Sequence, residues 1–158
     1  MGRPLCGLLL VVGAFFSVIA AIAFSADSKD EAIQKDRQQI EGTWRVVTLE
    51  VDGNQAMEDD AKKLTVVNGA DGTWSLHSEG KEISKGTSII DPTKTPKTID
   101  FEPSDGDEKD VQRLGIYELG ENTRKFCFAS PGAEWPTDFV SRPGSKIILV
   151  TLQRQKAK

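Results

Sequence analysis

Short segments in which apolar and polar residues alternate, each ended by a turn signal, make up most of this 158-residue chain. The clearest segment runs from Thr73 to His77, where Trp74 and Leu76 share one face of a strand. Asn68-Gly69 and Asp71-Gly72 are turn signals that precede it. Strands joined by such short links pair antiparallel, because a parallel crossover needs roughly a dozen residues or more. The pattern therefore predicts a mainly β domain with antiparallel strands.

Eight or nine strands are expected in this domain. They are predicted at 44–51, 64–67, 73–77, 82–90, 98–101, 114–119, 125–128 and 147–152, with a weaker strand at 139–140. Gly86 interrupts the fourth of these, which is compatible with a bulge, and residues 55–63 fit a loop or a helical turn. Because closure shields the edges of so many strands, we predict a small antiparallel barrel or half-barrel.

The first 25 residues differ in composition from the rest. Arg3 is the only early positive charge, residues 8–24 are apolar or small, and small residues follow around Ala23 and Ser25. This order predicts a secretory signal at 1–25 and an exported, periplasmic or extracellular domain. The alternative is an uncleaved membrane anchor, since about 20 apolar residues can span a bilayer.

The remaining chain divides into three parts. Residues 26–41 are mostly polar, and Ser28 and Glu31 fit a capping box at the start of a short helix, although a linker is the alternative. Residues 42–154 form the predicted β domain, and residues 155–158 are a basic tail.

The charge of the chain bears on its partners. The formal net charge is −4, and no basic cluster with interleaved aromatic residues is present. Because an acidic surface repels phosphate backbones, nucleic acid is not expected as a partner. Membrane contact is expected only through an uncleaved N-terminal segment, and the oligomeric state is left open.

Few residues of the sequence indicate a catalytic or metal-binding site. His77 is the only histidine, and alternation places it opposite Trp74 and Leu76, with no spacing typical of a hydrolytic triad. The acidic loop at 105–110 lacks the full pattern of an EF-hand, which favours a solvated turn over a calcium site. Cys127 is compatible with a buried apolar residue, a reactive thiol or a dimer disulfide. We therefore expect no catalytic site, no metal and no cofactor.

Five blocks of sequence, taken together, resemble a lipocalin-like domain family that is expanded in planctomycetes. They are 40–44 (IEGTW), 91–100 (DPTKTPKTID), 115–119 (GIYEL), 126–129 (FCFA) with Pro131-Gly132, and 141–145 (SRPGS). The resemblance runs from Ile40 to about Arg154 and implies an exported small β-barrel with no established activity. Arg124 departs from the family pattern, where an apolar residue is expected, and Trp135 stands where an arginine is expected.

The resemblance also implies roles for individual residues. Gly42 and Trp44 match the Gly-x-Trp entry of lipocalin-like barrels, in which the Trp closes one end of the barrel, often beneath an Arg of the last strand. Arg154 is placed to be that Arg. These three residues are expected to be structural.

Two functions remain open. In the first, the barrel or its mouth binds a small apolar or amphipathic ligand, with Trp135, Tyr117 and Phe128 as expected contacts. In the second, a filled barrel serves as a structural or protein-interaction module at the cell envelope. The many large inward side chains expected here favour a filled interior over a wide cavity.

Overall fold

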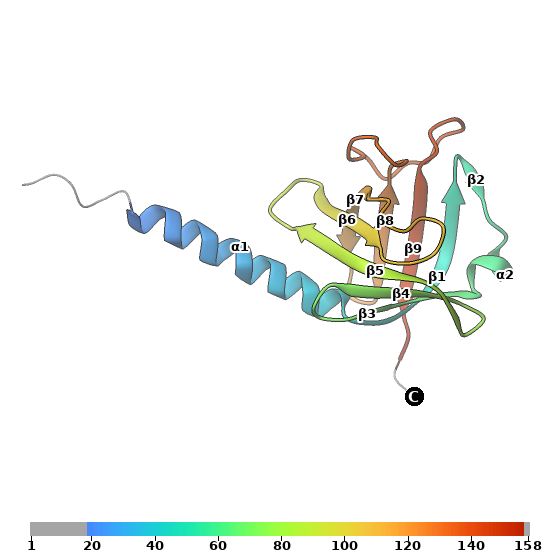
Figure 1. Ribbon diagram of the computed structural model, residues 1–158, viewed down its shortest axis with the longest axis horizontal. Coiled ribbons are helices and arrows are strands. Elements are labelled where there is room, and N and C mark those ends of the chain that lie inside the picture. Colours follow the sequence, from blue (N-terminus) through green and yellow to red (C-terminus); the bar gives the residue numbers. More distant parts are fainter. Residues whose placement is uncertain (1–18, 157–158) are drawn as a thin grey trace, which may run out of the picture.

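The computed structural model describes residues 19–156, which form a closed antiparallel barrel with a helix at one end. The first strand pairs with both the third and the last, so the sheet closes on itself as eight strands, with one short extra strand, β2, at its margin. The prediction of a mainly β, lipocalin-like barrel is confirmed (Figure 1). The strands are β1 (Gly42–Val51), β2 (Asn54–Gln55), β3 (Leu64–Asn68), β4 (Thr73–Ser78), β5 (Lys81–Asp91), β6 (Lys97–Pro103), β7 (Arg113–Leu119), β8 (Thr123–Phe128) and β9 (Ile148–Arg154).

Most of the predicted strands are found near their expected positions, with two corrections. Residues 139–140 form no strand and belong to the long connection between β8 and β9. The irregularity in β5 lies at Ile83, between the partners of Leu76 and His77, so the bulge suggested at Gly86 was misplaced. Gly86 instead allows close approach of two strands, because a Cβ there would lie 2.1 Å from the backbone oxygen of Glu102. A short helix, α2 (Glu58–Ala61), occupies the predicted loop or helical turn.

Helix α1 (Ile19–Ile40) precedes the barrel and extends away from it (Figure 1). Ser28 and Glu31 lie inside this helix, so the predicted capping box at its start was wrong. Its residues 19–25 belong to the stretch assigned to a signal, while the rest of that stretch lies outside the described residues. Within 19–156, no helix has the length and apolar character needed to cross a membrane.

The C-terminal half of α1 is attached to one end of the barrel by buried polar contacts. The Asp36 carboxylate accepts hydrogen bonds from the Tyr117 hydroxyl at 2.6 Å and from Lys97 Nζ at 2.7 Å. Arg37 donates to the hydroxyl and the backbone oxygen of Ser88. Burial and the hydrogen bond to Asp36 raise the pKa of Tyr117 above its ordinary value, so its hydroxyl stays protonated and keeps donating to Asp36.

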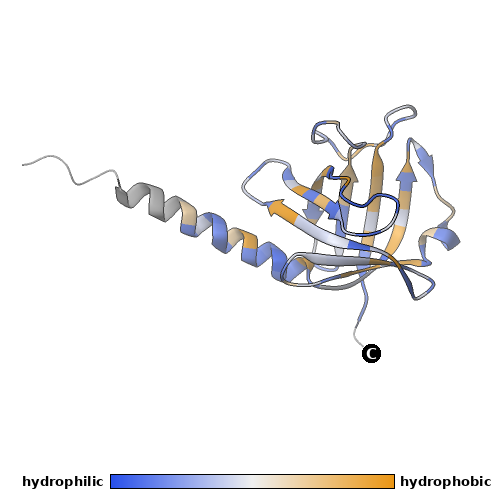
Figure 2. Cartoon of the chain, in the orientation of Figure 1, coloured by the Kyte–Doolittle hydropathy of each residue, from blue (hydrophilic) through white to orange (hydrophobic). Residues whose placement is uncertain are grey.

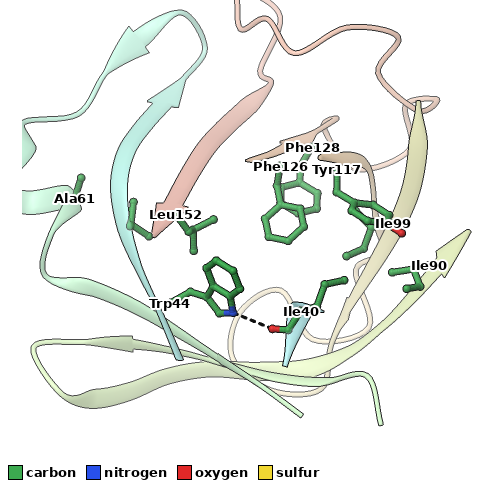
Figure 3. Packing of buried hydrophobic residues seen from close by; sticks show 10 residues of the cluster. Ile40, Trp44, Ala61, Ile90, Ile99, Tyr117, Phe126, Phe128 and Leu152 are labelled. Atoms are coloured by element: carbon green, nitrogen blue, oxygen red, sulfur yellow. Dashed lines mark hydrogen bonds between the residues drawn. The ribbon is translucent and has the colours of Figure 1, made fainter. Parts of the chain in front are cut away.

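The most deeply buried part of the hydrophobic core lies next to α1, where Ile40, Trp44 and Leu152 are at most 2% exposed. Ile40, the last residue of the helix, packs with Trp44 and Leu152, and the Trp44 Nε1 donates to the Ile40 carbonyl oxygen at 2.8 Å (Figure 3). Figure 2 shows polar residues along most of the described part of α1, while apolar residues concentrate on the strands. The helix is therefore held along its C-terminal half, from the ion pair between Lys29 and Asp91 to Ile40. It covers this end of the barrel, which we call the closed end.

Candidate functional site

The other half of the barrel surrounds a cavity of about 240 Å³ with an entirely apolar lining. The lining comes from β1, β3, β4, β6, β8 and β9, because every second residue of a strand points to the same side of the sheet. Its members are Val46, Leu49, Leu64, Val66, Trp74, Leu76, Phe101, Phe126, Phe128, Ile148, Val150 and Leu152. The interior is thus filled at the closed end and hollow above it, whereas the sequence favoured filling.

The cavity opens at the end of the barrel opposite α1. Leu49, Leu64 and Ile148 lie at that end of their strands and are only partly buried, although all three line the cavity. Val46 and Leu152, which lie nearer the closed end, are almost fully buried. The cavity is therefore an apolar cup with its mouth toward solvent and its floor toward the helix.

Four aromatic rings of the wall pack edge to face, with Phe101 in contact with the other three. Phe101 lies 5.1 Å from Trp74, 6.0 Å from Phe126 and 4.9 Å from Phe128, measured between ring centroids. The interplanar angles range from 61° to 89°, an arrangement that aromatic rings prefer over face-to-face stacking. These contacts fix the shape of the wall before any ligand enters.

Below the floor lies a buried arginine. Arg124, on β8, is 1% exposed, and its guanidinium lies 4.5 Å from the Trp44 ring centroid and 4.9 Å from that of Phe126. Burial, together with the nearby charge of Arg154, lowers the pKa of Arg124. The side chain at this position therefore places a cation inside the apolar barrel.

Arg154, on β9, lies on Trp44 with its guanidinium carbon 4.2 Å from the ring centroid. Its terminal nitrogens donate to the backbone oxygens of Glu41, at 2.8 Å, and Gln39, at the C-terminal end of α1. Gly42 has a φ of 113° and lies against this guanidinium, since a Cβ there would be 3.0 Å from Arg154 Nη1. The three residues expected to be structural thus meet at the closed end.

The structure separates the three residues expected to contact a ligand. Phe128 lines the cavity. Tyr117 is inside the barrel but points its hydroxyl to Asp36, near the closed end. Trp135 lies outside, 47% exposed, in the connection between β8 and β9, where its Nε1 donates to Asp100 Oδ1 at 2.8 Å.

The residues considered for catalysis or metal binding show no complete site. His77 Nε2 lies 2.8 Å from the Ser75 hydroxyl, but within residues 19–156 no carboxylate is hydrogen-bonded to the imidazole. In the acidic loop, Glu108 pairs with Arg113, and Asp105 accepts from the Lys85 backbone. No cluster of three or more potential metal ligands occurs among the described residues.

Cys127 is completely buried on the side of β8 opposite Phe126. Burial raises the pKa of its thiol to about 11. Because the thiolate is the reactive form, about one Cys127 in a thousand is ionised at pH 8. We expect iodoacetamide to modify Cys127 at least about 100-fold more slowly in the folded protein than in urea, as measured by peptide-resolved mass spectrometry. Equal rates in the two states would contradict this placement.

Several residues that line the cavity or lie beneath it were not predicted from the sequence. Val66, Leu49 and Leu64 were not named as cavity residues, although alternation places Val66 on the same side as Leu64. Arg124 was named from the sequence only because an apolar residue was expected at its position. Its spacing from Phe126 and Phe128 was the available signal, because residues i, i+2 and i+4 of a strand share one face.

Comparison with known proteins assigns this chain to no family. No protein-family model matches the chain, and no curated protein matches it. A solved structure of a DUF4847 family protein from Bacteroides vulgatus is similar, with 14% sequence identity and a TM-score of 0.45. The similarity covers 75% of this chain and 95% of that one.

Proposed function

We propose that this barrel binds a small apolar or amphipathic molecule in the cavity lined by Phe101, Phe126 and Phe128. The observation that carries the proposal is an apolar cup of about 240 Å³ with no polar group in its lining. Burying apolar ligand surface against such walls is favourable by about 25 cal/mol per Å². An eight-stranded barrel leaves room for one small ligand when side chains do not fill it.

The volume limits the size of the ligand. An apolar cavity of about 150 Å³ takes up benzene, so a cavity of about 240 Å³ scales to about ten carbon atoms. A medium-length alkyl chain, or a substituted aromatic ring, fits this limit. Because the cup is open at one end, such a ligand can enter without unfolding of the barrel.

We also propose that the domain acts outside the cytoplasm. The support is the sequence of residues 1–25, with its early positive charge, apolar stretch and small residues near Ala23 and Ser25. Expression of the full chain followed by N-terminal sequencing of the exported product tests this proposal. An N-terminus that retains Met1 in the cytoplasmic fraction would contradict it.

Filling the cavity is expected to abolish binding. Val66 on β3 points into the cavity, and its neighbour Val67 is 38% exposed on the outer face. We expect Val66→Phe to weaken binding of 1-aminonaphthalene, a fluorescent probe with ten carbons, by at least about 10-fold, because the added ring occupies the space that the probe needs. Val67→Phe, the matched control, adds the same ring outside and is expected to leave binding unchanged.

Probe fluorescence, measured in titrations of the wild type and both variants, checks this expectation, with decan-1-ol as a competitor. Far-UV circular dichroism establishes that each variant retains its β structure. The proposal fails if the wild type does not bind the probe or if both variants bind as tightly as the wild type.

A further inference from the structure

The guanidinium of Arg124 is a buried cation that lacks a counter-charge. No carboxylate of the described residues lies within 4.0 Å of it, and its Nε is a buried nitrogen with no hydrogen-bond partner. The Asn68 amide, with its oxygen turned toward the guanidinium, accepts from Nη1 at 3.2 Å and from Nη2 at 2.9 Å. The Ile40 carbonyl oxygen accepts a longer bond of 3.4 Å from Nη1. All of these partners are neutral.

The end of α1 compensates only part of this charge. A helix C-terminus carries about half a negative charge. Two guanidiniums share this partial charge, because Arg154 and Arg124 both lie against Trp44 and both donate hydrogen bonds to carbonyl oxygens at the end of α1. Arg154 is partly exposed and takes the two shorter bonds, which leaves Arg124 as the less compensated cation. A buried charge of this kind is costly unless an opposite charge meets it.

The position of Arg124 relates this charge to the cavity. Arg124 precedes Phe126 by two residues on the inward face of β8, and its register partner on β9 is Leu152. Phe126 and Leu152 both line the cavity, and the guanidinium packs on the Phe126 ring. The cation therefore lies one side chain below the floor of an apolar cup.

We propose that the ligand of this barrel is an amphipathic carboxylate whose apolar chain fills the cup and whose head group is directed to Arg124. The inference rests on the proposed binding function and names the class of ligand. A carboxylate supplies the missing negative charge and an acceptor for the Nε–H, and charge-assisted hydrogen bonds of this type are roughly twice as strong as neutral ones. The Phe126 ring covers the guanidinium, so it has to turn aside for the carboxylate to reach the nitrogen.

A pair of ligands with one chain and two head groups tests the inference. At pH 7.5 decanoate is ionised, while decan-1-ol carries the same ten carbons without charge. We expect the wild type to bind decanoate about 10-fold to 100-fold more tightly than decan-1-ol, as measured by displacement of 1-aminonaphthalene. Decanoate is also expected to change the fluorescence of the protein, because Trp44 lies 4.5 Å from the Arg124 guanidinium.

Two variants separate charge from packing. Arg124→Met keeps a long apolar side chain and is expected to bind both ligands with equal affinity, within about 2-fold. Arg124→Lys keeps the cation and is expected to retain a preference for decanoate. Circular dichroism of both variants establishes folding, and the wild-type comparison of the two ligands stands even if neither variant folds.

The outcomes distinguish this inference from the proposed function. Equal binding of decanoate and decan-1-ol by the wild type would overturn the carboxylate inference and leave apolar binding intact. A preference for decanoate that survives in Arg124→Met would also overturn it. Failure of both ligands to displace a bound probe would exclude medium-chain ligands altogether, and absence of probe binding would overturn both proposals.

Discussion

Replacing Trp44 with alanine is expected to lower the free energy of unfolding by about 3–5 kcal/mol, the usual cost of truncating a buried Trp. The side chain is 1% exposed and fills the space between Ile40 and Leu152 at the closed end (Figure 3). Its Nε1 hydrogen bond to the Ile40 carbonyl oxygen joins β1 to the end of α1. The substitution therefore removes both core packing and a buried contact with the helix.

Charge adds to this loss. The guanidiniums of Arg124 and Arg154 both lie against the indole ring, 4.5 Å and 4.2 Å from its centroid. Each cation is attracted by the face of the ring, an interaction estimated at about 2 kcal/mol when desolvated. In the variant both cations lose this attraction, so the effect is expected toward the upper end of the range.

Trp135→Ala is the matched control for this experiment. That ring is 47% exposed and makes a single side-chain hydrogen bond to Asp100. We expect a loss of less than about 1 kcal/mol there, as is usual for exposed positions. Urea unfolding followed by far-UV circular dichroism measures both variants without relying on tryptophan emission. Similar unfolding midpoints for Trp44→Ala and the wild type would show that Trp44 is not part of the core.

The barrel could be predicted from sequence because local signals carry most of the information for antiparallel strands. Turn residues such as Asn68-Gly69 end one strand and start the next, and alternation then assigns Trp74 and Leu76 to one face. The strand predicted at 139–140 was wrong because two β-formers in a row have no partner strand to pair with there. Propensity alone does not form a strand.

The site was less predictable for a different reason. Whether a barrel is filled depends on how side chains from six strands meet, and no local pattern encodes the resulting 240 Å³ cavity. Trp135 was expected to contact a ligand because exposed aromatic side chains often form binding sites. Its ring instead donates a hydrogen bond to Asp100 on the outer surface of the barrel. Arg124 is a different case, because alternation with Phe126 and Phe128 was readable in the sequence, but the predicted strand began only at residue 125.

Phe126→Ala is expected to lower the free energy of unfolding by about 3–5 kcal/mol as well. The ring is 3% exposed and contacts Phe101, Phe128 and Tyr117, with centroid distances from 5.6 Å to 6.5 Å. Deleting it removes these aromatic contacts and leaves a larger hollow above Arg124. Phe126→Leu, which keeps most of the volume, is expected to cost about 1–1.5 kcal/mol. Urea titrations of the two variants measure both values.

The same substitution tests how the floor of the cup works. The Phe126 ring lies against the Arg124 guanidinium, with its centroid 4.9 Å from the guanidinium carbon, and separates it from the cavity. Because the ring no longer has to turn aside, Phe126→Ala is expected to raise the affinity for decanoate relative to decan-1-ol beyond the wild-type ratio. Saturating decanoate should then recover more of the lost stability than decan-1-ol, since a ligand stabilises the state that it binds. Equal recovery by the two ligands would mean that uncovering the guanidinium does not bring it into contact with the ligand.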